Sequence, residues 1–402
     1  MSGGRDKPAL RRLLLQLAGT ACPPSPDALA ALDEADWQSL DLLAAEHRMQ
    51  PLLHAAHRDN PHVPEPMRAI WRTAHREAAL DAVSARADLL ETVALLRANG
   101  IEPLAMKGAW LSWHAYPAPA LRPMRDVDLL VAPEHFLAAV DLLLAQGWPM
   151  AEEPEMSLAD IVRHDKSPPP IIARRGTGIE LHLRAWFPEG KLDYPSPAPD
   201  DAGMFARSRC EADGVRYPGG QDMLAHLVIH AVYSHRLDCG PLLLSDIDYL
   251  LQREAIDWPA FWARADAQGW SGGARLVLEL VRRWRDPPQL DLSGTPGGPP
   301  PAALIESAPD LLLQDLSTRY SAGFAAAVLT GGPRVLLRRL TGRSAGVGEG
   351  AQPERNMARE GGFVSWAVSR LRRTAGEVAS SDVRRQATDL ARLSRWLGGG
   401  PR

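Results

Sequence analysis

Cysteine is scarce in this chain of 402 residues. The sequence contains three, Cys22, Cys210 and Cys239, and they lie far apart. A zinc site or a disulfide framework would need cysteines paired at short, regular intervals. We therefore exclude a cysteine-based metal centre and a disulfide-stabilised secreted domain, and we expect the three thiols to be reduced.

Long apolar runs and a strong net charge are also missing. No run approaches the roughly 18 apolar residues of a membrane-spanning helix, and the N-terminus lacks a signal-peptide cleavage pattern. These absences predict a cytoplasmic protein without a transmembrane segment. The formal net charge of −4 argues against nucleic acid as a partner. Residues 331–402 differ from the rest, since they carry fourteen arginines against six acidic residues.

The order of apolar, Gly and Pro residues divides the chain into four regions. Residues 1–80 are predicted to be a helical N-terminal region, and residues 81–215 to be a core in which helices alternate with short strands. Residues 216–290 return to a helical pattern that would pack on the core, and residues 291–402 form a Pro/Gly linker with a basic helical tail. Because strands are expected only in the middle, the predicted fold class is α+β, a small mixed sheet flanked by α-helical regions.

Within the core, several elements have recognisable ends. An amphipathic helix over residues 81–99 should end at Gly100, and another helix should begin at Pro133 and end at Gly147. Strands are predicted at 101–108, 126–132, 171–175 and 178–186, with the last two joined in a hairpin by Gly-Thr-Gly.

Asp126 and Asp128 begin the strand DVDLLVA. Alternate residues of a strand point to the same face, so the two carboxylates should lie together. Glu180 on the strand GIELHLRAW is the natural third carboxylate, and His182 should face outward with it. Such a set suits Mg²⁺, or Mn²⁺ in its place, together with the phosphates of a nucleoside triphosphate. The competing interpretation is an acidic pair that is simply solvated at a sheet edge.

A glycine-containing turn precedes this strand in the segment MKGAWL. Gly108 could bring backbone N–H groups close to a phosphate, and Lys107, Arg122 and Arg125 supply cations for a triphosphate. These residues and the carboxylates predict a nucleotide site.

Taken in order, the segments LAMKGAWL, RPMRDVDLLV and IELHLRAW resemble a family. They are similar to bacterial nucleotidyltransferase proteins with an LKG…R…DIDLLV…ELHW signature, which belong to the polymerase-beta-like nucleotidyltransferase superfamily. The resemblance is strongest over residues 80–190 and continues into the helical segment HLVIHAVYSHRL. It implies metal-binding roles for Asp126, Asp128 and Glu180 and a phosphate-side role for Gly108.

The same resemblance implies an enzyme that moves a nucleoside monophosphate from an NTP to an acceptor and releases pyrophosphate. The acceptor would be a small molecule or a protein, the latter as in a toxin–antitoxin-type enzyme. The broader superfamily often has serine after the turn glycine, whereas this chain has Ala109. That departure supports an alternative, a nucleotide-binding or scaffold protein that keeps the fold but has weak or no activity.

Other features have weaker functional interpretations. His226 and His230, one helical turn apart, could join His235, Asp246 and Asp248 in a zinc site, although packing beside the cleft is favoured. His164 and Lys166 could line the cleft, with an ordinary loop pair as the favoured interpretation, and Trp110 and Trp186 are expected mainly in the core. The amphipathic segment 363–378 predicts a helix that packs on the protein, contacts a partner protein or lies on a membrane surface.

Overall fold

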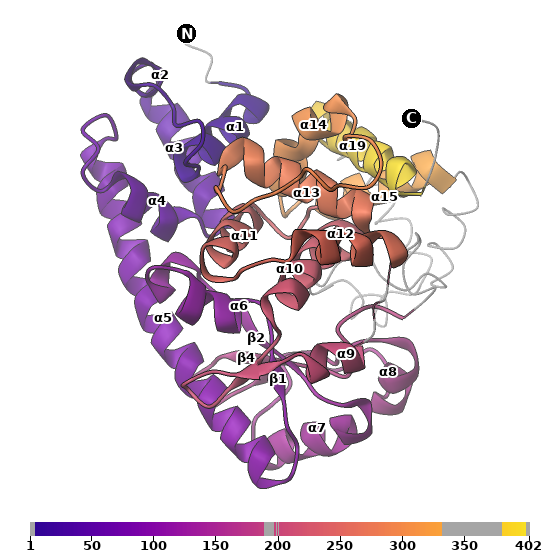
Figure 1. Cartoon of the computed structure of the whole chain (residues 1–402). Helices are drawn as coiled ribbons and strands as arrows, with labels where there is room; N and C mark the ends of the chain where they lie inside the picture. The colour runs from indigo at the N-terminus through magenta and orange to yellow at the C-terminus, as the bar shows by residue number, and fades with distance from the viewer. Residues whose placement is uncertain (1–4, 189–196, 198, 200, 332–379, 399–402) are drawn as a thin grey trace, which may run out of the picture.

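The computed structural model describes residues 5–188, 197, 199, 201–331 and 380–398. A small sheet lies between α7 and the larger group of helices, and helices make up most of the molecule (Figure 1). This arrangement confirms the predicted α+β class with helical regions on both sides of the sheet in sequence. The predicted helix over residues 363–378 lies outside the described residues. Among the helices that are described, each falls short of the length or the apolar character that a membrane span requires.

The sheet has four strands in the order β1-β2-β4-β3. They are β1 (Leu104–Ala105), β2 (Asp126–Leu130), β3 (Ile171–Ile172) and β4 (Gly178–His182). β1 is antiparallel to β2, β2 is parallel to β4, and β3 is antiparallel to β4, so the sheet is mixed and the predicted hairpin is confirmed. The two central strands are parallel neighbours, which places the β2 and β4 side chains of one face next to each other.

One long helix runs along the edge of the molecule and reaches the sheet. α5 (Glu65–Ala98) is a single helix of 34 residues, so the helix predicted over residues 81–99 begins earlier, within the N-terminal helical region. Its length is about 50 Å at the usual helical rise. Residues 65–98 contain no internal proline after the first turn and no glycine, so nothing interrupts the helix. It ends just before Gly100, which has a φ of 77°, as predicted.

The faces of the sheet are covered by short helices and by turns. α6 (Gly108–Trp110) continues into the π-helix η1 (Leu111–Ala115), and 3₁₀ turns η2 (Pro119–Leu121) and η3 (Pro133–His135) flank β2. α7 (Phe136–Ala145) follows and packs on β4 and α5. Its buried residues, Phe136, Ala139, Val140 and Leu143, have the spacing of one helical face.

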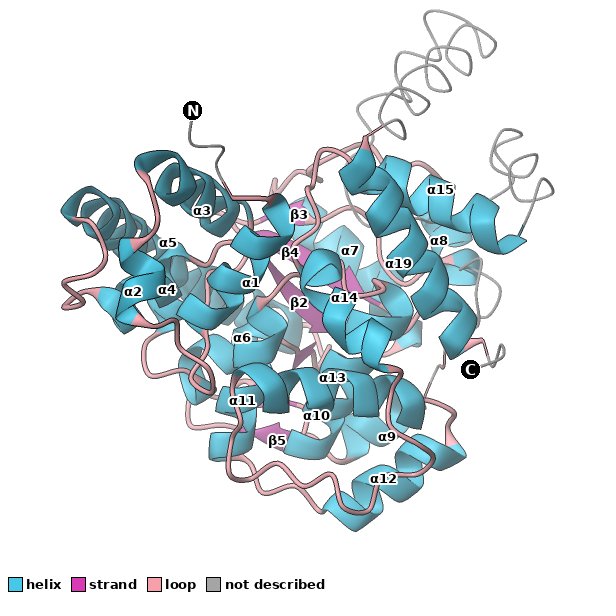
Figure 2. Cartoon of the chain, turned by 90° about the horizontal axis from the view of Figure 1, so that it is seen from above, coloured by secondary structure: helices cyan, strands magenta, loops and turns pink. Residues whose placement is uncertain are grey.

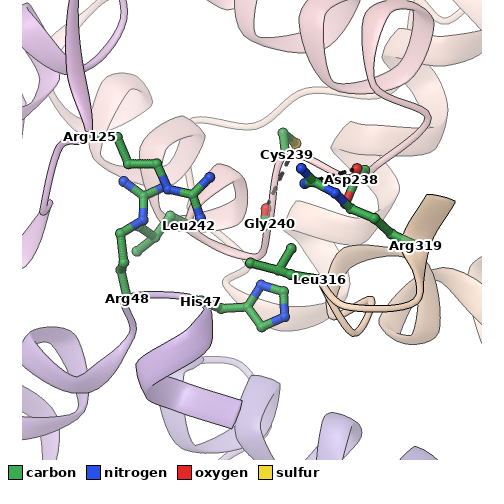
Figure 3. Close-up of a pocket in the computed structure, with 9 residues that line it drawn as sticks. All are labelled: His47, Arg48, Arg125, Asp238, Cys239, Gly240, Leu242, Leu316 and Arg319. Carbon is green, nitrogen blue, oxygen red and sulfur yellow. Dashed lines mark hydrogen bonds and ion pairs between the residues drawn. The ribbon is translucent and has the colours of Figure 1, made fainter. Parts of the chain in front are cut away.

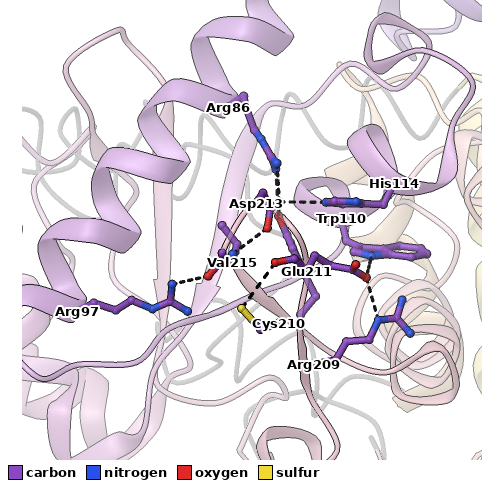
Figure 4. Close-up of polar contacts among 11 residues, drawn as sticks. Arg86, Arg97, Trp110, His114, Arg209, Cys210, Glu211, Asp213 and Val215 are labelled. Atoms are coloured by element: carbon purple, nitrogen blue, oxygen red, sulfur yellow. Dashed lines mark hydrogen bonds and ion pairs between the residues drawn. The ribbon is translucent and has the colours of Figure 1, made fainter.

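A small hairpin fastens the core to α5. Its strands are β5 (Arg209–Cys210) and β6 (Arg216–Tyr217), and it follows α8 (Leu158–His164) and α9 (Asp201–Ala206). The turn residue Asp213 accepts hydrogen bonds from Arg86 of α5 and from Tyr217, and it lies 3.1 Å from His114 Nε2 (Figure 4). One carboxylate thus ties together three elements that are distant in sequence.

The remaining helices form a layered bundle next to the sheet (Figure 2). Its central part consists of α10 (Gly220–Ile229), the π-helix η4 (His230–Ser234), α11 (Leu242–Arg253), α12 (Trp258–Ala267) and α13 (Ser271–Trp284). The N-terminal part consists of α1 (Lys7–Ala18), α2 (Pro26–Ala30), α3 (Glu34–Glu46) and α4 (Gln50–His57), and the C-terminal part of α14 (Ala302–Leu312), α15 (Arg319–Gly331) and α19 (Ser381–Leu397).

The two ends of the chain meet in this bundle. α1 packs on α14, and α14 packs on α19. The buried guanidinium of Arg11 lies 2.9 Å from Asp310 Oδ1 and 3.0 Å from Asp382 Oδ1. The first helix is therefore joined by charge to α14 and to α19, the last of the described helices.

Candidate active site

Asp128, Glu180 and His182 form a buried cluster on the two central strands. Their potential metal-ligand atoms all lie within 4.8 Å of one another, and the residues are only 4, 7 and 1% exposed, respectively. The parallel register sets Asp128 directly opposite Glu180. Neighbouring strands are about 4.8 Å apart, so two carboxylates in register are held close together. Like charges this near one another need a cation between or beside them.

Two cationic or proton-donating groups already contact Asp128. Lys107 Nζ lies 2.8 Å from Asp128 Oδ1, and His182 Nε2 lies 3.0 Å from Asp128 Oδ1 and 3.0 Å from Glu180 Oε2. Burial by itself would raise the pKa of Asp128, but Lys107 and His182 outweigh it and hold that pKa well below its usual range. Burial would lower the pKa of His182, yet its hydrogen bonds to the two carboxylates raise it. The carboxylate of Asp128 is thus kept ionised and ready to bind a cation.

Lys107 reaches Asp128 from a strained turn. It has a φ of 46° at the junction of β1 and α6, in a region that L side chains seldom adopt. The backbone N–H of Met106 donates to the carbonyl of Asp128, which anchors the turn to β2. The turn therefore holds the ammonium group over the strand that carries the carboxylates.

Gly108 is required in this turn by a neighbouring side chain. A Cβ added at Gly108 would lie 2.5 Å from Arg122 Nη1 and 3.0 Å from the side chain of Met124. Arg122 is held there by Asp246 of α11, with Nε and Nη2 at 3.1 and 3.0 Å from the two carboxylate oxygens. Tyr116 also donates to Asp246, at 2.7 Å. Arg122 therefore supports the turn, and its guanidinium is already paired with a buried carboxylate.

Asp126 is not a member of the cluster that Asp128 forms. It is half-buried at the start of β2 and pairs in register with Gly178, which has no side chain. His182 lies two residues after Glu180 on β4, and its longer imidazole side chain reaches both carboxylates, with Nε2 3.0 Å from Asp128 Oδ1 and from Glu180 Oε2. His182 therefore joins the cluster in the place expected for Asp126.

Glu180 and His182 share a face of β4, as predicted, but that face is not outward. Every residue of β4 is buried, because helices cover both sides of the sheet. His226 of α10 lies near the cluster, since Lys107, Asp128 and His182 all influence its pKa, which burial lowers well below the usual value. Its ring contacts Trp186 and stacks on His230, with centroids 5.0 and 5.7 Å away. These histidines therefore pack near the cluster, in contact with one another and with Trp186.

The other residues with a predicted functional role lie in different surroundings. Asp246 and Asp248, which the zinc alternative would use, are paired with Arg122 and Arg285. Among the described residues, neither aspartate lies in a group of three or more potential metal ligands. Lys166 is buried close enough to His182 to affect its pKa, whereas His164 is exposed. Trp110 is buried and donates from Nε1 to Glu211, as Figure 4 shows, so it belongs to the core.

Two residues that support the segments around the cluster were not identified from the sequence. Asp246 was considered only as a zinc ligand, although it holds Arg122 against the turn. Arg48, from the N-terminal helical region, donates to the carbonyl of Pro123 shortly before β2, and its pKa responds to the charge of Asp126. Both contacts join segments distant in sequence, and no local pattern signals them.

Comparison with known proteins agrees with the geometry. Residues 33–286, more than half of the chain, match a family described as uncharacterised nucleotidyltransferase. No curated protein and no solved structure matches the chain. The matched segment begins just before α3, ends just beyond α13 and includes the whole sheet and the buried cluster. The chain therefore belongs to this uncharacterised nucleotidyltransferase family.

Proposed function

We propose that the protein is a metal-dependent nucleotidyltransferase that moves a nucleoside monophosphate from an NTP to an acceptor hydroxyl. The observation that carries the proposal is the buried cluster of Asp128, Glu180 and His182 beside Lys107. Family membership supports the same class of reaction. The acceptor would be a small molecule or a protein.

The donor atoms fit a divalent cation. Two carboxylates and an imidazole offer ligand atoms within 4.8 Å of one another, and Asp126 lies two residues before Asp128 on the same strand. We propose that Asp126, Asp128 and Glu180 hold Mg²⁺ or Mn²⁺, with His182 as a neighbouring donor that would suit Mn²⁺ better than Mg²⁺. When bound, such an ion would polarise the α-phosphate and favour ionisation of the attacking hydroxyl.

The chain's own side chains would bind and orient the substrates. Lys107 neutralises Asp128 in the absence of a cation, and it would turn to the triphosphate when a cation takes over that charge. Arg125, exposed just before β2, would contact the phosphates as well, while Arg122 would keep Gly108 and its turn in position. Glu180 and His182 would orient the acceptor hydroxyl, and the carboxylate of Glu180 would accept its proton.

In the proposed reaction, the acceptor oxygen forms a bond to the α-phosphorus. The bond from the α-phosphorus to the oxygen that bridges to the β-phosphorus breaks, and pyrophosphate leaves with both electrons of that bond. Lys107 and Arg125 would balance the charge that develops on the leaving group.

A second candidate is a nucleotide-binding scaffold without turnover. The observation that favours it is that Asp128 already has Lys107 and His182 as partners, so the chain itself supplies positive charge to this carboxylate. Ala109 after the turn glycine also lacks the hydroxyl found in many superfamily members.

Thermal stabilisation by each NTP, with and without Mg²⁺ or Mn²⁺, tests the proposal on the full-length protein. We expect a rise in melting temperature that needs the metal and disappears in Asp128→Asn. Asp141→Asn changes an exposed aspartate of α7 and should keep the full rise. Pyrophosphate release in the presence of cell extract then separates an enzyme from a scaffold. A full metal-dependent rise in Asp128→Asn would show that the nucleotide binds elsewhere.

A further inference from the structure

A second polar site borders the carboxylate strand. It is a small recess formed by four segments: the turn between α3 and α4, the residue before β2, the loop before α11 and the loop that leads into α15 (Figure 3). We call it the arginine recess. Its lining residues are His47, Arg48, Arg125, Asp238, Cys239, Gly240, Leu242, Leu316 and Arg319.

Positive charge dominates the arginine recess. Three arginines line it against one carboxylate, Asp238, which lies 3.4 Å from Arg319 Nη1. Figure 3 shows the guanidinium groups of Arg48 and Arg125 next to each other, on the opposite side from the Asp238–Arg319 pair. Burial together with the nearby charges of Arg125 and Arg122 lowers the pKa of Arg48 to about 10. Two cations held side by side would be stabilised by an anion that contacts both.

The donors of the recess are held in place before any ligand arrives. Arg48 has a φ of 58°, a strained conformation for an arginine, and its Nη1 donates to the carbonyl of Pro123 at 3.0 Å. Its buried Nε atom has no hydrogen-bond partner among the described residues. His47 is only 7% exposed, and its Nε2 atom likewise has no hydrogen-bond partner among the described residues. Buried polar atoms left without partners cost free energy, which a bound acceptor of hydrogen bonds would recover.

The recess is close to the proposed active site. Arg125 directly precedes Asp126, and the charge of Asp126 affects the pKa of Arg48. Cys239 lines the recess on another side, and the charge of Lys107 affects its pKa. Leu316 and Arg319 lie beyond residue 286, where the family match ends, so this chain closes the recess with residues outside the matched segment.

We propose that the arginine recess is an oxyanion site that binds a phosphate or carboxylate group. Planar guanidinium groups match both anions with paired hydrogen bonds, and the small size of the recess suits one such group. Because the recess borders Asp126, the group belongs to a substrate of the transfer reaction; this assignment rests on the proposed function. It is either the terminal phosphate of the NTP or an acidic group of the acceptor.

Calorimetric titration of the full-length protein with inorganic phosphate and with acetate, at constant ionic strength, tests the site. We expect saturable binding of at least one of them that weakens at least tenfold in Arg48→Gln and in Arg319→Gln. Arg58→Gln changes an exposed arginine close in sequence and should bind as the wild type does. Circular dichroism of each variant shows that it is folded. Absence of saturable binding to the wild type, or equal affinity in folded Arg48→Gln and Arg319→Gln, overturns the proposal.

Two further titrations identify the source of the anion. If saturating NTP with Mg²⁺ abolishes phosphate binding, the recess takes the terminal phosphate of the nucleotide. If phosphate still binds, the recess takes the acidic group of the acceptor. Asp128→Asn should keep its phosphate binding, so the recess can be established even if the nucleotidyltransferase proposal fails. Conversely, metal-dependent stabilisation by an NTP, without saturable binding of either phosphate or acetate, would overturn the recess proposal alone.

Discussion

At the scale of single residues, the molecule keeps several ionisable groups in unusual protonation states. Asp128 stays ionised because Lys107 and His182 contact it, although it is almost fully buried. His47 shows the opposite effect, since burial lowers its pKa to about 4 and the ring stays neutral at physiological pH. Such groups link stability to pH wherever the folded and unfolded pKa values differ.

His47 gives a prediction with a definite sign. In the unfolded chain a histidine binds a proton below a pH of about 6.5, whereas folded His47 does so only near pH 4. The stability associated with neutral His47 is therefore fully present above pH 6.5 and is lost as the pH falls toward 4. By pH 5 this loss should be about 2 kcal/mol.

Urea unfolding at pH 7.5 and pH 5.0 measures this loss. We expect the difference in unfolding free energy between the two pH values to shrink by about 2 kcal/mol in His47→Gln. His62→Gln, which changes an exposed histidine, should leave that difference as in the wild type. An unchanged difference in His47→Gln would mean that His47 takes up its proton equally well in both states.

At the scale of elements, a short turn and a pair of parallel strands organise the site. The register of β2 and β4 pairs Asp128 with Glu180, and the turn after β1 brings Lys107 to them. The space beside Gly108 is filled by Arg122, which α11 holds through Asp246. The position of the turn thus depends on a helix more than a hundred residues later in the chain.

Gly108→Ala should disturb this element. The new Cβ would meet Arg122 and Met124 too closely, and moving Arg122 would weaken its ion pair with Asp246. We expect a loss of roughly 1–3 kcal/mol in the free energy of unfolding, measured by chemical denaturation. Gly272→Ala is the matched control, because its Cβ would make an ordinary contact of 3.6 Å with Trp396. If both variants are equally stable, the turn tolerates a Cβ and Arg122 moves freely.

At the scale of the whole molecule, contacts between distant segments join the two ends of the chain and close the arginine recess. Arg11 connects α1 to Asp310 on α14 and to Asp382 on α19. Segments from the N-terminal, core and C-terminal parts of the chain line the recess. The division of the chain near residues 80, 215 and 290 stays a prediction.

Removing the charge of Arg11 should weaken the contact of α1 with α14 and α19. Arg11→Met leaves buried Asp310 without its cation, which typically costs about 3 kcal/mol or more in unfolding free energy. Arg12→Met changes an exposed neighbour on the same helix and should have little effect. Chemical denaturation of the two variants makes the comparison. Equal stability would mean that the ends contribute independently to the fold.

The sequence predictions were accurate for features that neighbouring residues determine and less accurate for features that depend on packing between distant segments. The strand at Asp126–Leu130, the hairpin before β4 and the end of α5 before Gly100 follow local patterns and were predicted correctly. Strand alternation shows that Asp126 and Asp128 share a face but not which of them lies close to Glu180 and His182, and the metal-binding roles of the two aspartates stay a prediction. The burial of Glu180 and His182 depends on the helices that cover the sheet.

By itself, the sequence determined the fold class, the order of the core elements and the residue types that could bind a metal and a triphosphate. These properties depend on periodicity, turn residues and short spacings, which act within one or two neighbouring elements. The tertiary structure alone decided that His182 completes the cluster, that Asp246 holds Arg122 and that Arg48 and Arg319 face the same recess. Each of these contacts joins side chains from separate elements, and their energies depend on distance and burial, which only the packed chain sets.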